Sequence, residues 1–225
     1  MRNTAWMRRV LTAFIFSIMT IGPAAFAQDQ EPAALSAAEV PVTDETAVKA
    51  DPAPAMDEAL MAKFKEYSTP NENHKVLEAF AGNWTAVVKQ WMAPNGDPTV
   101  SEGKSVNALI FDGRFLEQKF SGTFMETPFE GTGLFGYDNI KKEYESLWFD
   151  NMATGIMRGK LQYDPATKTF SEESHFSCPL TNSERTSRGK ITLVDAGHYT
   201  QEFFMADLAT GEEFKSMEIS YSRVK

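Results

Sequence analysis

The sequence predicts a mainly β protein: a single antiparallel up-and-down β-barrel of about ten strands, preceded by one or two short N-terminal helices. From residue 83 onward the hydrophobic pattern changes from a helical period to a period of two. Turn-forming residues such as Pro94–Asp97, Asp112–Gly113 and Asp195–Gly197 separate the alternating segments. No helical pattern interrupts these segments, so neighbouring strands are expected to pair as antiparallel hairpins and not as βαβ units.

Residues 1–27 have the pattern of a cleaved secretory signal peptide. Arg8 and Arg9 precede an apolar run from Val10 to Ile21, and Ala25-Phe-Ala27 offers a small-residue cleavage site. A membrane-spanning helix needs about 20 apolar residues, so this run is too short for an anchor. We therefore expect a periplasmic or secreted protein with no integral membrane segment after cleavage.

Two segments separate the signal from the strands. Residues 28–56 are rich in Ala, Pro and acidic residues and contain no aromatic residue, which predicts a disordered linker. In residues 57–81 apolar side chains recur at helical spacing, and Pro70 divides the segment into two short helices. We expect these helices to cap the barrel, which is assigned to residues 82–225.

The net charge excludes one class of partner. The chain carries a formal charge of −9, and residues 1–27 contain three arginines and no acid, so the mature chain would carry −12. Such a surface repels phosphate backbones and anionic headgroups, which argues against nucleic-acid binding. The single cysteine, Cys178, cannot form an internal disulfide, and no second Cys or basic residue adjoins it, so a buried apolar role is favoured over a reactive one.

Alternation along the strands assigns their faces. Phe120 and Phe124 share one side of their segment, and Met217 and Tyr221 share one side of the last segment, opposite Ser216. A sheet with one apolar and one polar face must bury the apolar one. Ten strands can do so by closing into a barrel, and sequential hairpins suit that arrangement better than the competing two-sheet sandwich.

Gly82-Asn-Trp84 directly follows the second helical segment and opens the first strand. This motif resembles the Gly-x-Trp start of lipocalin and calycin barrels. The resemblance implies that a basic residue near the end of the final strand lies across the tryptophan, and Arg223 stands at that place. We expect Trp84 and Arg223 to act in structural closure of the barrel, through a cation–π contact.

A larger block of motifs resembles the bacterial family called domain of unknown function 1579. The residues that carry the resemblance are His74-Lys-x-Leu77, Gly82-x-Trp84, Asp112-Gly-Arg-Phe-Leu116, Pro128-Phe-Glu-Gly131, Gly136-Tyr-Asp-Asn139 and Tyr163-Asp-Pro-Ala-Thr167. The match covers residues 72–224. It implies a calycin-like fold and no catalytic residues.

The chemistry-bearing motifs do not identify an enzyme. Gly131-Thr-Gly-Leu-Phe-Gly136 matches a dinucleotide fingerprint, but a turn and another strand follow it where that fingerprint needs a helix. Glu172 and Glu173 point to opposite faces of one strand, so they are not an acid–base pair. No catalytic residue, metal site or cofactor is predicted; haem or metal ligation by His175 or His198 is an alternative that solvent-facing histidines outweigh.

The inward faces therefore provide the candidate site. The expected lumen residues for ligand binding are Gln118, Phe120, Phe124, Trp148, Gln201, Phe203, Met217 and Tyr221. The first functional hypothesis is an exported barrel that binds a small, mostly apolar ligand in this lumen. The second is a structural or protein-interaction module whose barrel is filled and whose edge or loops meet a partner. An enzyme that uses lumen residues is the least supported. An interior cavity no larger than a few waters would count against the first.

Overall fold

A computed structural model describes residues 57–225, and the predictions made for residues 1–27 and 28–56 lie outside the described residues. Three short helical elements come first: α2 (Glu58–Ser68), α3 (Glu72–Val76) and the 3-10 helix η2 (Leu77–Phe80). Ten strands follow: β1 (Gly82–Gln90), β2 (Thr99–Ile110), β3 (Phe115–Phe124), β4 (Thr127–Asp138), β5 (Glu143–Asp150), β6 (Met157–Asp164), β7 (Thr169–Cys178), β8 (Ser183–Asp195), β9 (His198–Ala206) and β10 (Glu213–Arg223).

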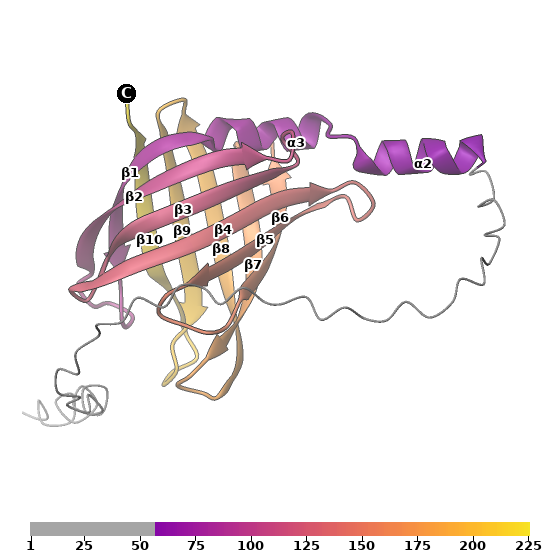
Figure 1. The fold of residues 1–225 in the computed structure, drawn as a ribbon. Helices are drawn as coiled ribbons and strands as arrows, with labels where there is room; N and C mark the ends of the chain where they lie inside the picture. The colour runs from indigo at the N-terminus through magenta and orange to yellow at the C-terminus, as the bar shows by residue number, and fades with distance from the viewer. Residues whose placement is uncertain (1–56) are drawn as a thin grey trace, which may run out of the picture. The chain divides into compact units, whose positions relative to one another are not determined.

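The ten strands form one closed antiparallel barrel, which confirms the predicted fold (Figure 1). Each strand pairs with its neighbours in sequence, and β1 closes the barrel by pairing with β10. Closure leaves no free sheet edge, so every strand has a partner on both sides. A β-bulge between Lys215 and Met217 changes the alternation in β10. Ser216, expected on the outer face, is therefore buried, and its hydroxyl donates to the carbonyl of Phe203.

The up-and-down topology gathers the connections between strands at two opposite ends of the barrel. The loops that join odd strands to even strands gather at one end, which we call the loop end: residues 91–98, 125–126, 151–156, 179–182 and 207–212. The other turns gather where α3 and η2 lie, which we call the helix end: residues 111–114, 139–142, 165–168 and 196–197. Figure 1 shows the helical segment running across this second end.

Local sequence explains how the helices begin and dock. Asn71 and His74 form a capping box at the start of α3, and the buried side chains of Leu77 and Phe80 in η2 pack into the barrel core. The helix α2, by contrast, has no buried residue. Its C-terminal end is held by Asn139, whose side-chain amide donates to the carbonyls of Glu66, Tyr67 and Thr69. The barrel is thus closed at its helix end by η2.

Candidate functional site

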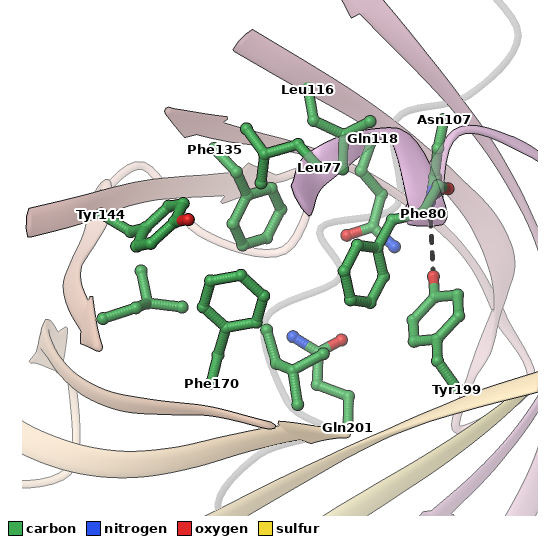
Figure 2. A pocket seen from close by; sticks show the side chains of 12 residues that line it. Leu77, Phe80, Asn107, Leu116, Gln118, Phe135, Tyr144, Phe170, Tyr199 and Gln201 are labelled. Carbon is green, nitrogen blue, oxygen red and sulfur yellow. Dashed lines mark hydrogen bonds between the residues drawn. The ribbon is translucent and has the colours of Figure 1, made fainter. Parts of the chain in front are cut away.

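A small cavity lies inside the barrel beneath η2 (Figure 2). Its volume is about 30 Å³, which is room for about two water molecules. Its polar lining consists of Asn107, Gln118, Tyr144, Tyr199 and Gln201, and its apolar lining of Leu77, Phe80, Leu116, Phe135, Leu161, Phe170 and Ile191. The cavity is therefore a pocket of water size with a mainly apolar lining, into which a few polar groups reach.

Asn107 connects the barrel wall to η2. Its side-chain amide donates to the carbonyl of Phe80 at 2.9 Å and to the hydroxyl of Tyr199 at 3.3 Å, the contact drawn in Figure 2. The side-chain oxygen of Asn107, Oδ1, accepts from the hydroxyl of Ser105 at 2.6 Å. Burial raises the pKa of Tyr199, so its phenol stays protonated at physiological pH. These bonds satisfy polar groups that would otherwise be left unpaired in the core.

Gln118 and Gln201 face each other across Tyr221. The amide of Gln118 donates to the hydroxyls of Ser105 at 3.1 Å and Tyr221 at 3.3 Å. The hydroxyl of Tyr221 in turn donates to the carbonyl of Gln201 at 3.5 Å. Tyr221 is 2% exposed, and burial raises its pKa. The sequence predicted these three residues as polar contacts in the lumen, and the structure brings them into one hydrogen-bonded chain.

The other residues expected in the lumen lie nearer the loop end, and none of them lines this cavity. Phe120 and Phe203 are buried, whereas Phe124, Trp148 and Met217 are partly exposed. The ring of Trp148 stacks on Phe129. It also covers Gly131, where an added Cβ would lie only 2.3 Å from the ring. The expected lumen residues near the loop end therefore do not belong to this cavity.

Arg223 lies across the indole of Trp84, with its guanidinium carbon 4.0 Å from the ring centroid. The two residues pair directly between β1 and β10. The guanidinium also donates to the carbonyls of Ala79, Ala81 and Ala196. Trp84 is 1% exposed and donates to the carbonyl of Phe80 at 2.9 Å. The pair therefore connects the barrel closure to the segment around η2.

Sequence reasoning missed Glu172 as a site residue. It considered this glutamate only together with Glu173, and the two do point to opposite faces: Glu172 is buried and Glu173 is exposed. The hydroxyl of Ser146 donates to Glu172 Oε1 at 2.5 Å. Burial raises the pKa of the Glu172 carboxyl, and the hydroxyls of Ser146 and Ser174 partly oppose that rise. The sequence did contain a sign that Glu172 faces inward. It lies two residues after Phe170 in β7, so both side chains point to the same face of the strand.

The histidines considered for haem or metal lie on the outside of the barrel. His175 is exposed near Glu173 and Glu184, and His198 is exposed beside Asp195. Cys178 is buried at the end of β7 as a free thiol. In residues 57–225 no group of three or more His, Cys, Asp or Glu side chains is placed to hold a metal ion. The same residues contain no helix that is long and apolar enough to cross a membrane.

Comparison with solved structures relates the chain to other barrels. The crystal structure of Rv2717c from M. tuberculosis matches with a TM-score of 0.53 at 12% identity, covering 70% of this chain and 100% of that chain. A redesigned β-barrel matches at 14% identity over 67% of this chain and 96% of its own, with a TM-score of 0.36. The first likeness shows the fold alone.

No curated protein was found to match the chain. The model of one protein family matches residues 69–223, which is most of the chain and nearly all of its described part. Its span includes the Gly82-Asn-Trp84 start, the closing Arg223 and the whole barrel between them. The chain therefore belongs to the family described as protein of unknown function (DUF1579).

Proposed function

We propose that this protein is an exported interaction module, which binds a cationic, apolar segment of a partner protein at its loop end. The observation that carries the proposal is the composition of the five loops there. Each presents an exposed apolar side chain, namely Met92, Met125, Met152, Leu180 and Leu208, with exposed fractions between 48% and 66%. Methionine is flexible and polarisable, and it is common on surfaces that adapt to different peptides.

The negative charge of the same five loops favours a positively charged partner. They contain Asp97, Glu126, Asp207 and Glu212, and no Lys or Arg. The nearby Arg185, at the start of β8, is already hydrogen-bonded, because its guanidinium N–H donates to the carbonyl of Ala206. An acidic surface with apolar side chains attracts a basic amphipathic segment and repels anionic lipid.

The turns at the helix end carry mainly the opposite charge. They contain Arg114, Lys141, Lys142 and Lys168, with Asp112 as their one acidic residue. The two ends are formed by the same kind of hairpin connection, so hairpin geometry alone does not require this difference. The contrast supports a specific role for the loop end.

The interior supports this choice over an apolar lumen ligand. A cavity of about 30 Å³ is far below the several hundred Å³ that pockets for drug-sized ligands usually have. The lumen-ligand hypothesis stays a prediction. Native mass spectrometry of the purified protein tests it: an added mass that organic extraction removes would favour the ligand.

Binding to a designed peptide tests the interaction. The probe is a fluorescent peptide of alternating Lys and Leu residues, and its control replaces every Lys by Glu. We expect saturable binding of the cationic peptide alone, with an affinity that falls as salt rises. In NMR spectra the peptide should shift amide signals of the five loops and leave those of the helix-end turns unchanged.

Matched variants locate the surface. The triple variant Met92→Ser, Leu180→Ser and Leu208→Ser should weaken peptide binding at least tenfold, whereas Phe111→Ser, an equally exposed apolar residue at the helix end, should leave it unchanged. Equal loss in both variants, or equal binding of the acidic peptide, would refute the proposal. Binding that depends on concentration-driven self-association, measured by analytical ultracentrifugation, would instead identify a second copy as the occupant.

Export is tested separately. We expect the mature protein to begin at Gln28 and to appear in the periplasmic or secreted fraction of a bacterial host. N-terminal sequencing after fractionation measures both. Retention of residues 1–27 on a cytosolic protein would refute export without affecting the interaction proposal.

A further inference from the structure

His74 is the one buried histidine of the described residues, and it lies at the start of the segment that closes the barrel. It is 6% exposed, whereas His175 and His198 are exposed on the outer wall. The helix α3, which carries His74, continues directly into η2, whose Leu77 and Phe80 are buried in the barrel. The interaction proposed for the loop end does not involve this segment.

The hydrogen bonds at the start of α3 require a neutral imidazole. The backbone N–H of Asn71 donates to His74 Nδ1 at 3.1 Å, so this nitrogen carries a lone pair. An imidazolium has a hydrogen on both ring nitrogens and accepts no hydrogen bond. Asn71 Oδ1 lies 3.3 Å from Nδ1, but it already accepts from the N–H of Asn73. Protonation of His74 therefore removes one of the two bonds of the capping box.

The surroundings of the ring also oppose a positive charge. Burial and the positive charge of Arg114, from the turn between β2 and β3, lower the pKa of His74, and a backbone hydrogen bond with Tyr137 partly offsets this. The ring of Tyr137 contacts the imidazole edge to face, with the centroids 5.7 Å apart. From β5, the hydroxyl of Tyr144 donates to a backbone carbonyl of α3, and burial raises its pKa, so it stays neutral.

The carboxylates around the segment do not compensate a charge on the ring, because they are exposed or have other partners: Glu72, Glu78, Asp112 and Asp138. Glu72 pairs with Lys75 at 2.7 Å, and Asp112 lies 3.6 Å from Arg114. Asp138 accepts from two N–H groups of its own turn, and Glu78 is exposed. In the described chain no ion pair joins His74 to a carboxylate. A proton on this ring is therefore costly while α3 is docked.

The same segment covers the interior cavity. Leu77 and Phe80 line that cavity from above, as Figure 2 shows. The carbonyl of Phe80 accepts from the indole N–H of Trp84 and from the amide of Asn107, both at 2.9 Å. The Phe80 ring also meets the ring of Tyr199 edge to face. These contacts exist only while η2 is docked, so its departure would open the cavity to solvent at the helix end.

We infer that His74 is an acid-sensitive switch: a proton from the solvent on Nδ1 releases the start of α3 and favours an open state in which α3 and η2 leave the barrel. In the open state the ring binds its proton with the ordinary pKa of 6.5, whereas in the closed state this pKa is lowered. The closed state is therefore favoured most above pH 6.5, and its advantage falls as pH drops below that value toward the closed-state pKa.

Hydrogen exchange of the full-length protein tests the switch. NMR follows it between about pH 7.5 and pH 5.5, and each rate is corrected for the intrinsic pH dependence of exchange. The reporters are the backbone N–H of Leu77, which donates to carbonyls of α3, and the indole N–H of Trp84, which donates to Phe80. We expect the protection factors of both to fall about fivefold or more over this range, while amides of the β8–β9 ladder keep theirs.

His74→Gln keeps the cap and removes the titrating ring, because glutamine is a usual residue at this position of a capping box. Its protection factors should stay constant over the same pH range. If it does not fold, His74→Glu replaces it, since glutamate also caps and its carboxylate is ionised throughout the range. His175→Gln and His198→Gln, which remove the exposed histidines, should behave as the wild type. Helix-end protection that does not change with pH in the wild type, or an equal fall in the His74 variant, would overturn the inference.

Discussion

Trp84 and Arg223 lie opposite each other across the seam between the first and last strands, and the arginine side chain covers the indole ring. The contact joins the two ends of the barrel sequence at the point where the barrel closes. It also fixes the segment that precedes β1, because Arg223 donates to the carbonyls of Ala79 and Ala81. Strand closure and helix docking therefore depend on the same pair.

Replacing the indole should weaken the whole fold. Trp84→Ala removes a side chain that is 1% exposed, and large aromatic-to-alanine changes in cores cost about 3–5 kcal/mol. We expect the melting temperature, measured by circular dichroism, to fall by several degrees or more. An unchanged melting temperature would contradict the closure role. Phe111→Ala, which truncates an aromatic residue that is 70% exposed, is the control.

The guanidinium should matter beyond its charge. Arg223→Lys keeps the positive charge but cannot reach three carbonyls with a planar fork. We expect a loss of about 1–3 kcal/mol in the free energy of unfolding, measured by urea denaturation. Faster hydrogen exchange in residues 77–81 should accompany it, because the carbonyls of Ala79 and Ala81 lose the guanidinium donor that holds this segment on the barrel. Full stability in this variant would show that charge over the indole is sufficient.

Asn139 should hold α2 without supporting the barrel. Its amide is bonded to the carbonyls that end this helix, while α2 buries no side chain. We expect Asn139→Ala to increase hydrogen exchange in residues 58–68 and to leave the melting temperature of the barrel nearly unchanged. The exposed Lys142→Ala in the same turn should change neither. A large fall in melting temperature would show that α2 contributes to global stability.

The buried carboxyl should make stability depend on pH. The folded-state pKa of Glu172 lies above its ordinary value of 4.5, so the unfolded chain releases this proton first as pH rises. The contribution of Glu172 to the free energy of unfolding is therefore highest below pH 4.5 and falls as pH rises toward the folded-state pKa. Glu172→Gln should remove this fall, whereas Glu173→Gln should not. Urea denaturation across this pH range measures the difference.

The glycine beside the carboxyl should resist substitution. Gly159→Ala places a methyl group against Glu172, Ser146 and Ser174, and overpacking of this kind costs about 1–3 kcal/mol. The same change in a Glu172→Ser background should cost less, because the shorter side chain frees the space. A double-mutant cycle measures this coupling. Additive effects would show that the Glu172 side chain is not what limits the space at Gly159.

Much of the architecture could be predicted from local sequence. Period-two alternation and turn residues predicted the antiparallel hairpins, and Gly82-Asn-Trp84 placed the first strand after a short helix. These features are set by neighbouring residues, because side-chain direction in a strand alternates with position. The one face that alternation misassigned was at Ser216, where a bulge adds a residue to the strand.

The environment of each side chain depended on contacts between distant strands. Glu172 was visible as an inward residue by its phase with Phe170, but alternation does not show that Gly159, Gly189 and Ser146 surround its carboxyl. Likewise, the polar chain links Gln118 to Tyr221, 103 positions away, and Tyr221 to Gln201, 20 positions away, so only strand register brings all three together.

The sequence by itself determined the family, the β-hairpin order and the acidic, apolar composition of alternate loops, because each is a property of local pattern. Only the tertiary structure decided that these loops share one end of a closed barrel and that its cavity has room for about two waters. The physical reason is packing: how much space remains inside a barrel depends on how side chains from all ten strands meet, and no local pattern contains that information.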